Sequence, residues 1–178
     1  AKSAAKRKPG VRVALDIGPI GELLEPNGYL PFDDAYDLFA EQVIVGEKAG
    51  ADLIVFETMS DLYEVKAAIL AAKEHTRLPV FVTMSFEADH RTFTGCTTAS
   101  FALCAEGLGA DAIGINCSLG PDQILPIAEE LAAMSNLPLI IKANAGLPDP
   151  VTNTYSINAS GYAQMLTAFT KLPVTYVG

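Results

Sequence analysis

Residues 109–117 read GADAIGINC: a Gly-Ala-Asp lead-in, a short apolar run, and then Asn116 and Cys117 at its end. The run is nearly continuous instead of alternating with polar residues, which is typical of a strand buried on both faces of a parallel sheet. Working outward, the same lead-in recurs at residues 50–52, directly before the apolar run 53–56. A repeated lead-in indicates that one supersecondary unit is used more than once.

Leu-Pro pairs precede three further apolar runs, at residues 78–79, 137–138 and 172–173. Segments with helical periodicity separate the runs, and strands that alternate with helices predict parallel βαβ units with right-handed crossovers. The six predicted strands are 11–15, 53–56, 80–83, 112–115, 139–142 and 174–177.

Residues with capping chemistry mark where the helices are expected to begin, because side-chain oxygens there can accept the free N–H groups of the first turn. A carboxylate three residues after the cap can complete a reciprocal capping box. The expected starts are Asp33 or Asp34, Asp61 with Glu64 as a capping box, Thr98, Pro121 in a first turn, and Ser156 or Asn158.

Two architectures fit this order: an open doubly wound sheet and part of a (βα)8 barrel. Neither a Gly-x-Gly-x-x-Gly motif nor a Walker phosphate loop follows any predicted strand. A barrel gathers functional side chains from many strand ends at one rim, whereas an open sheet gathers them at one switch point. Polar side chains end strand after strand, which favours the barrel; they are Asp16, Glu57, Thr58, Ser85, Asn116, Cys117, Lys142 and Asn144.

The charge balance argues against a nucleic-acid partner. The 178 residues carry a formal net charge of -9, and five of the twelve basic residues lie within residues 1–12, leaving seven against 21 acids. Binding a phosphate backbone requires clustered Lys and Arg, which the body of the chain lacks. The sequence has no run of eighteen apolar residues, so we expect no membrane span.

The three cysteines, Cys96, Cys104 and Cys117, occur without a secretory signal, which predicts a cytoplasmic protein with free thiols or a metal ligand. We expect Cys96 and Cys104 to be packing residues. Cys117, at a strand end, is a candidate nucleophile, a soft metal ligand, or simply a small buried side chain.

Glu57 follows four apolar residues, where a carboxylate is costly unless it has a cationic or hydrogen-bonding partner. A substrate ammonium or a backbone N–H would serve. Asn144 and Gly146 predict a turn that aims an amide at the rim. Lys142 is a lone strand lysine, which is weak evidence for Schiff-base chemistry.

Three motifs, FETMSD at 56–61, GINCS at 114–118 and NAGLP at 144–148, together resemble the homocysteine S-methyltransferase family, and most closely its cobalamin-dependent branch. The resemblance extends from Val11 to Gly178. It implies a (βα)8 TIM barrel of which this chain forms strands 3 to 8, with the first two strands missing. We therefore expect residues 1–178 to be a single homocysteine-binding domain that is incomplete at both ends.

The resemblance also implies a zinc ion held by three cysteines, of which Cys117 is the first. The other two form an adjacent pair in a Gly-Gly-Cys-Cys-Gly run after the eighth strand, and this sequence does not contain that pair. Glu57, Asn116 and Asn144 are the implied substrate-binding residues, with Glu57 contacting the amino group of homocysteine. Ala143 stands where the family usually has Pro.

The implied activity is methyl transfer from methylcobalamin to the thiol of homocysteine, which forms methionine. Zinc would deprotonate that thiol, whose pKa is otherwise near 8.5. The implied partners are homocysteine and the cobalamin-binding and methyltetrahydrofolate-binding modules of a longer parent protein. The alternatives are a methyltransferase that uses S-methylmethionine or betaine and a non-catalytic remnant or scaffold subunit. With one zinc ligand of three, we expect the chain alone to be inactive.

Overall fold

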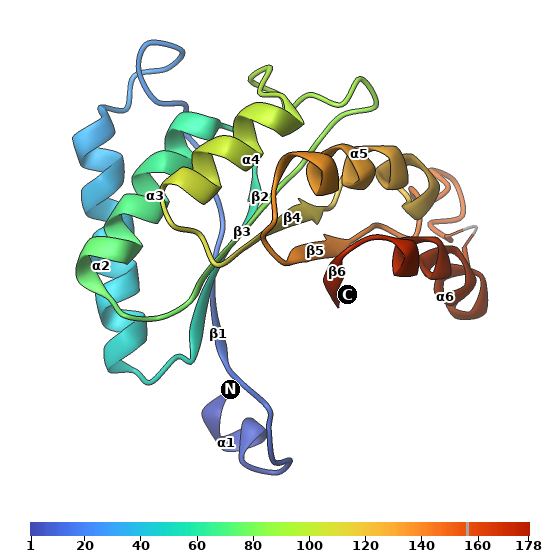
Figure 1. The fold of residues 1–178 in the computed structure, drawn as a ribbon, viewed down its shortest axis with the longest axis horizontal. Helices are drawn as coiled ribbons and strands as arrows, with labels where there is room; N and C mark the ends of the chain where they lie inside the picture. Colours follow the sequence, from blue (N-terminus) through green and yellow to red (C-terminus); the bar gives the residue numbers. More distant parts are fainter. Residues whose placement is uncertain (156) are drawn as a thin grey trace.

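A computed structural model of the chain describes residues 1–155 and 157–178, so the helix start expected at Ser156 lies outside the described residues. Helices and strands alternate along the described chain (Figure 1). In order, the elements are α1 (Lys2–Ala5), β1 (Ala14–Ile17), α2 (Phe32–Lys48), β2 (Leu53–Met59), α3 (Leu62–His75), β3 (Val80–Met84), α4 (Thr98–Gly107), β4 (Ala112–Asn116), α5 (Pro121–Met134), β5 (Leu139–Lys142), α6 (Ala159–Leu166), the 3-10 helix η1 (Thr167–Lys171) and β6 (Val174–Val177).

The six strands form one parallel sheet in the order β1-β2-β3-β4-β5-β6. A doubly wound sheet reverses its order at a switch point, whereas this order runs in one direction throughout. Helices α2 to α5 follow one another along the same side of the sheet (Figure 1). This is the winding of a barrel, as the strand-end pattern predicted.

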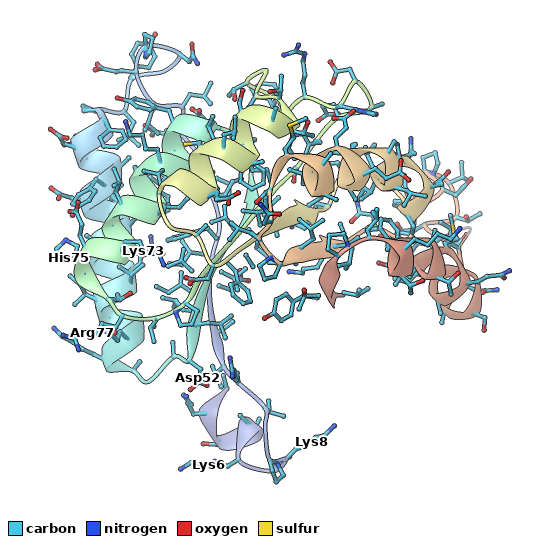
Figure 2. The ribbon with its side chains drawn as sticks, viewed as in Figure 1. Lys6, Lys8, Asp52, Lys73, His75 and Arg77 are labelled. Carbon is cyan, nitrogen blue, oxygen red and sulfur yellow. The ribbon has the colours of Figure 1, made fainter. Side chains whose placement is uncertain are left out.

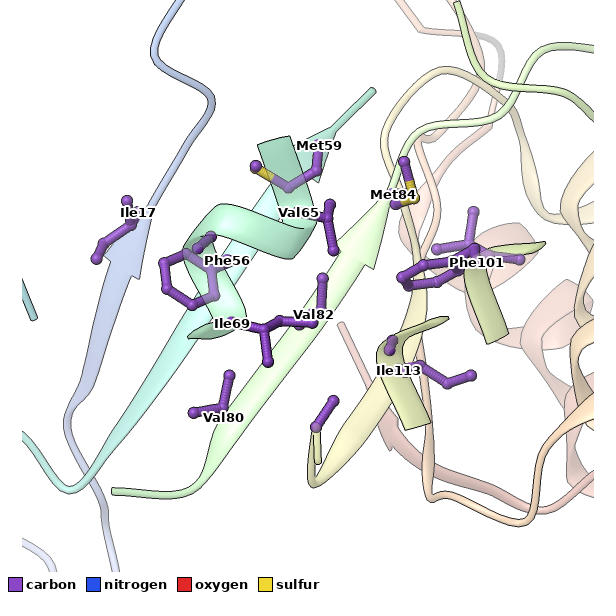
Figure 3. Packing of buried hydrophobic residues seen from close by; sticks show 14 of the residues in the cluster. Ile17, Phe56, Met59, Val65, Ile69, Val80, Val82, Met84, Phe101 and Ile113 are labelled. Carbon is purple, nitrogen blue, oxygen red and sulfur yellow. The ribbon is translucent and has the colours of Figure 1, made fainter. Parts of the chain in front are cut away.

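The core lies between the sheet and those helices. Alternate strand residues, among them Phe56, Val82 and Ile113, pack with Val65 and Ile69 of α3 in one buried cluster (Figure 3). Successive strand residues point to opposite faces, so the positions between them face the other side of the sheet. We call that side the inner face, and it carries the candidate site.

The repeated Gly-Ala-Asp lead-in has one structural role in both places. Asp52 accepts the N–H of Val13 at 2.6 Å, and Asp111 accepts the N–H of Val80 at 2.8 Å, so each aspartate clamps the chain at the start of the preceding strand. Each also pairs with a lysine at 2.7 Å, Lys2 and Lys73 respectively. The hydrogen bond from Lys2, followed by that from Val13, lowers the pKa of Asp52.

These clamps lie at the amino ends of the strands, the end of a barrel that serves stability. Figure 2 shows Asp52 there, and Lys6 and Lys8 on the N-terminal segment, apart from the sheet. Within the described residues, no helix is long and apolar enough to cross a membrane.

Three predicted starts were wrong, and β2, β3 and β4 end later than the predicted runs. The first strand covers Ala14–Ile17, not 11–15, which places Asp16 inside the strand. Helix α2 begins at Phe32 after Pro31, so Asp33 and Asp34 lie in its first turn, where carboxylates favour the helix dipole. Helix α4 is capped by Thr97, which accepts the N–H of Ser100, instead of by Thr98.

The predicted capping box at α3 was half right. Asp61 accepts the N–H of Tyr63 at 2.9 Å and caps the helix. Glu64 instead accepts the N–H of Ile20 at 2.6 Å, because its side chain faces the loop after β1 and is only 3% exposed. The expected starts at Pro121 and Asn158 are confirmed.

Candidate functional site

A bulge at the carboxyl end of β2 turns two consecutive polar side chains to the inner face. The pairing of β2 with β3 shifts register between Phe56 and Met59, and both of these residues belong to the core cluster. Glu57 and Thr58, between them, therefore both face away from the helices. Thr58 has φ 62°, a left-handed conformation that costs a β-branched residue about 1–3 kcal/mol. Bulges and strained backbone of this kind are common beside functional sites.

Asn116, at the end of β4, ties three strands together. Its Oδ1 accepts the backbone N–H of Thr58 at 2.8 Å and the hydroxyl of Thr83 at 2.7 Å. Its Nδ2 donates to Thr58 Oγ1 at 2.7 Å and to Cys117 Sγ at 3.5 Å. These four bonds engage the whole hydrogen-bonding capacity of the amide, which is 2% exposed as a residue. Asn116 thus has a positioning role, and a direct contact with substrate would require one of these bonds to open.

Cys117 follows β4 in a strained turn. Its φ is 59° and that of Ser118 is 58°, both left-handed. Its backbone N–H donates to Lys142 O at 3.1 Å, and Thr58 Oγ1 lies 3.9 Å from Sγ. The residue is partly exposed. The protein thus holds one accessible thiol at a strand end with two polar contacts that define its place.

Glu57 has a cationic partner within the protein. Lys142, at the end of β5, donates to Glu57 Oε2, and the two side chains are 39% and 24% exposed. Asp16 lies near both: its pKa is raised first by burial and then by the Glu57 carboxylate, while Lys142 opposes the shift. Three charged groups from β1, β2 and β5 therefore share the inner face.

Asn144 lies just beyond β5, on the loop that follows the strand. Its backbone N–H donates to Leu119 O at 3.0 Å. It lines a cavity of about 500 Å³ together with Leu147 and Tyr155. Gly146 has φ 83°, as the predicted turn requires.

The structure therefore brings Asp16, Glu57, Asn116, Cys117 and Lys142 to one end of the sheet, with Asn144 on the adjoining loop. It does not bring the other two cysteines there. Cys96 and Cys104 line a separate cavity of about 400 Å³ beside α3 and α4. Burial raises the pKa of both thiols, that of Cys96 to about 11.

Sequence reasoning missed two residues of the site. Thr83 was hidden inside an apolar run, and its only signal was the two-residue spacing from Ser85, whose hydroxyl donates to Asn116 O at 3.0 Å. Tyr162 had no signal as a site residue. Its hydroxyl lies 2.8 Å from Ala143 O and 3.0 Å from Gly178 O, so α6 braces the end of β5 and of β6.

The described residues around Cys117 do not form a complete metal site with it. Among residues 1–155 and 157–178, no group of three or more His, Cys, Asp and Glu side chains could hold a metal ion. The two further cysteine ligands that the resemblance implied are not in this sequence.

Comparison with known proteins identifies relatives of this architecture. The chain is 30% identical over 137 residues to a methionine synthase of Mycobacterium leprae and 31% identical over 137 residues to one of Mycobacterium tuberculosis. These matches cover 74% of this chain and only 11% of either relative.

A solved structure shares the fold. The metallated form of the homocysteine methyltransferase MmuM from Escherichia coli superposes with a TM-score of 0.80 over 99% of this chain and 60% of that protein, at 18% identity. The likeness shows the fold alone. The family model described as homocysteine S-methyltransferase matches residues 1–178. With its six-strand parallel sheet and its motifs in register, the chain belongs to the homocysteine S-methyltransferase family.

Proposed function

We propose that residues 1–178 are the homocysteine-binding part of a methionine synthase, and that their six strands correspond to strands 3 to 8 of a (βα)8 barrel. The one-directional strand order and the 60% coverage of MmuM support this placement. In this proposal, residues 1–178 belong to one homocysteine-binding domain. The chain spans 11% of the methionine synthases that it matches, which leaves room for other modules in such a protein.

A single observation supports this function best: among the described residues, Cys117 is the thiol at the strand ends, and it is held by Asn116 and Thr58, next in sequence to the partly exposed carboxylate of Glu57. An amino-acid thiol needs a group for its ammonium and a second group near its sulfur. Glu57 binds the ammonium in this proposal, and Asn144 contributes its amide from the adjoining cavity. Asn116 and Thr58 fix the position of Cys117, and fixed placement of reacting groups lowers the barrier that orientation would otherwise impose.

Cys117 is also proposed as one ligand of a zinc ion, which when bound lowers the pKa of a substrate thiol. The described residues do not fit a complete zinc site, because they supply only this one thiol at the strand ends. We therefore assign no step of the reaction to the metal. The methyl donor in this proposal is methylcobalamin on another module, with a methyltetrahydrofolate-binding module as a further partner. All three cysteines are free thiols, as the reducing cytoplasm that we propose as the setting would maintain them.

The test is a methyl-transfer assay of the longer protein that this proposal implies, because residues 1–178 alone lack a complete zinc site and are expected to be inactive. The assay supplies L-homocysteine and, in turn, methylcobalamin, S-methylmethionine and betaine. We expect methionine to form with methylcobalamin only. Cys117→Ala should lower the rate of methyl transfer by about 100-fold or more, since even a change to a residue that supports a metal ligand typically costs 10- to 100-fold. Cys104→Ala is the matched control and should retain the rate. Turnover with S-methylmethionine or betaine would show that this compound, and not methylcobalamin, is the methyl donor. Binding of homocysteine without turnover from any donor would favour a scaffold subunit.

A further inference from the structure

Two opposite charges meet across the inner face with two strands between them. Glu57 stands on β2 and Lys142 on β5, and the ammonium of Lys142 contacts Glu57 Oε2. Both side chains keep part of their surface exposed, so the pair borders an accessible space and not a sealed core. An ion pair of this exposure adds little to stability, because water screens it and two long side chains must be ordered to form it. Structural support alone is therefore a weak explanation for it.

The pair is joined on both sides to the residues around the Cys117 thiol. Lys142 O accepts the backbone N–H of Cys117 at 3.1 Å. Glu57 directly precedes Thr58, whose Oγ1 lies 3.9 Å from Cys117 Sγ. A ligand that contacts the pair would thus lie next to residues that hold that thiol in place.

Asp16 adds a second carboxylate, so the cluster holds two acids and one base. The Glu57 carboxylate raises the pKa of Asp16 and Lys142 lowers it, so the three groups lie close enough for their charges to interact. In such a cluster an incoming carboxylate is repelled by two groups and attracted by one. Lys142 is the single group of the cluster that could receive a carboxylate.

We propose that Glu57 and Lys142 together form a receptor for the zwitterionic end of an α-amino acid, with Lys142 as the specificity-determining residue that binds the α-carboxylate. This inference rests on the proposed function, in which Glu57 binds the α-ammonium. The ligand opens the Glu57–Lys142 pair and replaces it with two pairs, so every charge stays compensated and no unpaired charge is desolvated. The receptor selects α-amino acids over thiols that lack either charge.

An opposite role for Lys142 is a mask that occupies Glu57 and competes with the substrate ammonium. The two roles predict opposite signs. Removing a receptor weakens the binding of a carboxylate ligand, whereas removing a mask strengthens the binding of any ammonium ligand.

The test measures affinities of four ligands by calorimetry, with the purified protein as wild type, Lys142→Met and Glu57→Gln. The ligands are L-homocysteine, 4-mercaptobutanoate without the ammonium, 3-aminopropane-1-thiol without the carboxylate, and L-2-aminobutyrate without the thiol. We expect Lys142→Met to weaken the binding of L-homocysteine and of 4-mercaptobutanoate at least tenfold. The binding of 3-aminopropane-1-thiol should be unchanged or tighter. Glu57→Gln should weaken the binding of 3-aminopropane-1-thiol and leave the binding of 4-mercaptobutanoate unchanged or tighter.

Lys171→Met, an exposed lysine of η1 at the amino end of β6, is the matched control and should change no affinity. Lys142→Arg should restore carboxylate binding, which separates lost charge from lost folding. An equal loss of affinity for all ligands in Lys142→Met, or tighter binding of L-homocysteine, would overturn the receptor. Lys142-dependent binding of L-2-aminobutyrate, together with no methyl transfer by the longer protein, would keep the receptor and refute the proposed function. Absence of binding by all four ligands would overturn both.

Discussion

Asn116 on β4 accepts the backbone N–H of Thr58 on β2 at 2.8 Å, past the intervening strand β3. The two residues are 58 positions apart in the chain, and Thr58 holds a left-handed φ of 62°. A buried amide on one strand therefore stabilises a strained turn on another. The same amide also donates a hydrogen bond to Cys117 Sγ and so positions the thiol. Stability and site geometry therefore depend on one side chain.

Replacing Asn116 by Ala should lower the free energy of unfolding by about 2–4 kcal/mol, because the Thr58 N–H and the Thr83 hydroxyl lose their partner in a buried place. Urea unfolding followed by circular dichroism measures the change. Gln42→Ala, which removes an exposed amide on α2, should stay within about 0.5 kcal/mol of wild type. A loss below about 1 kcal/mol for Asn116→Ala would show that the network is dispensable for stability.

Gly114→Ala should destabilise the protein by at least about 3 kcal/mol or prevent folding, because overpacking against rigid backbone is not relieved by a rotamer change. A Cβ at this position would lie 2.0 Å from Ile140 O, so β4 and β5 would have to separate. Gly107→Ala is the control: outside the chain neighbours and the backbone of its own helix, no atom lies within 4 Å of its Cβ position at the end of α4. It should be neutral or slightly stabilising. Similar unfolding midpoints for the two variants would contradict the close strand approach.

At the amino ends of the strands, Asp111→Ala should cost about 1–3 kcal/mol, because the Val80 N–H loses its acceptor. Lys73→Met should cost less than about 1 kcal/mol, because an exposed ion pair is screened by water. Thermal unfolding of the two single variants measures the difference. If both changes cost the same, the ion pair, and not the backbone clamp, would be the stabilising feature.

The pH dependence of stability should carry a contribution from Glu64. Burial raises its pKa above 4.5, against the opposing effect of the Ile20 N–H and with a smaller contribution from Asp61. A carboxyl group with a raised folded pKa binds its proton more tightly in the native state, so stability falls as pH rises from about 4.5 through that folded pKa. Burial raises the pKa of Asp16 as well, so part of the fall is common to both proteins compared below.

Glu64→Gln cannot ionise and should lack the Glu64 part of this fall. Unfolding free energies measured from pH 4 to pH 8 should show the difference, wild type minus variant, decreasing through this window and then levelling. A difference that increases with pH would mean that the ionised carboxylate is stabilised by its surroundings.

Metal analysis checks the expectation that the chain alone lacks a complete zinc site. After purification in the presence of zinc and gel filtration, residues 1–178 should retain less than about 0.1 zinc per chain, because one thiolate cannot replace a full ligand set. One tightly bound zinc per chain that disappears in Cys117→Ala would contradict this expectation and would require ligands that the described residues do not provide.

Local signals were enough to predict much of the fold. The bounds of β5 and β6 match the predicted runs 139–142 and 174–177, because a Leu-Pro pair marks where each strand begins. The predicted start of the first strand was three residues too early, since Val11 and Val13 extend the apolar pattern without joining the sheet. Glu64 was misassigned because its partner, the Ile20 N–H, comes from a loop 44 residues away.

The sequence by itself determined the alternation of strands and helices, the polar strand ends and the family, because each depends on neighbouring residues or on short motifs. Only the tertiary structure decided what Glu57 and Asn116 contact. The bulge that turns both Glu57 and Thr58 inward arises from pairing with β3, not from the local pattern. Lys142 reaches Glu57 over 85 residues of sequence because the winding of the sheet brings β5 back toward β2. Such pairings depend on strand register and sheet curvature, which the whole chain sets and no single segment encodes.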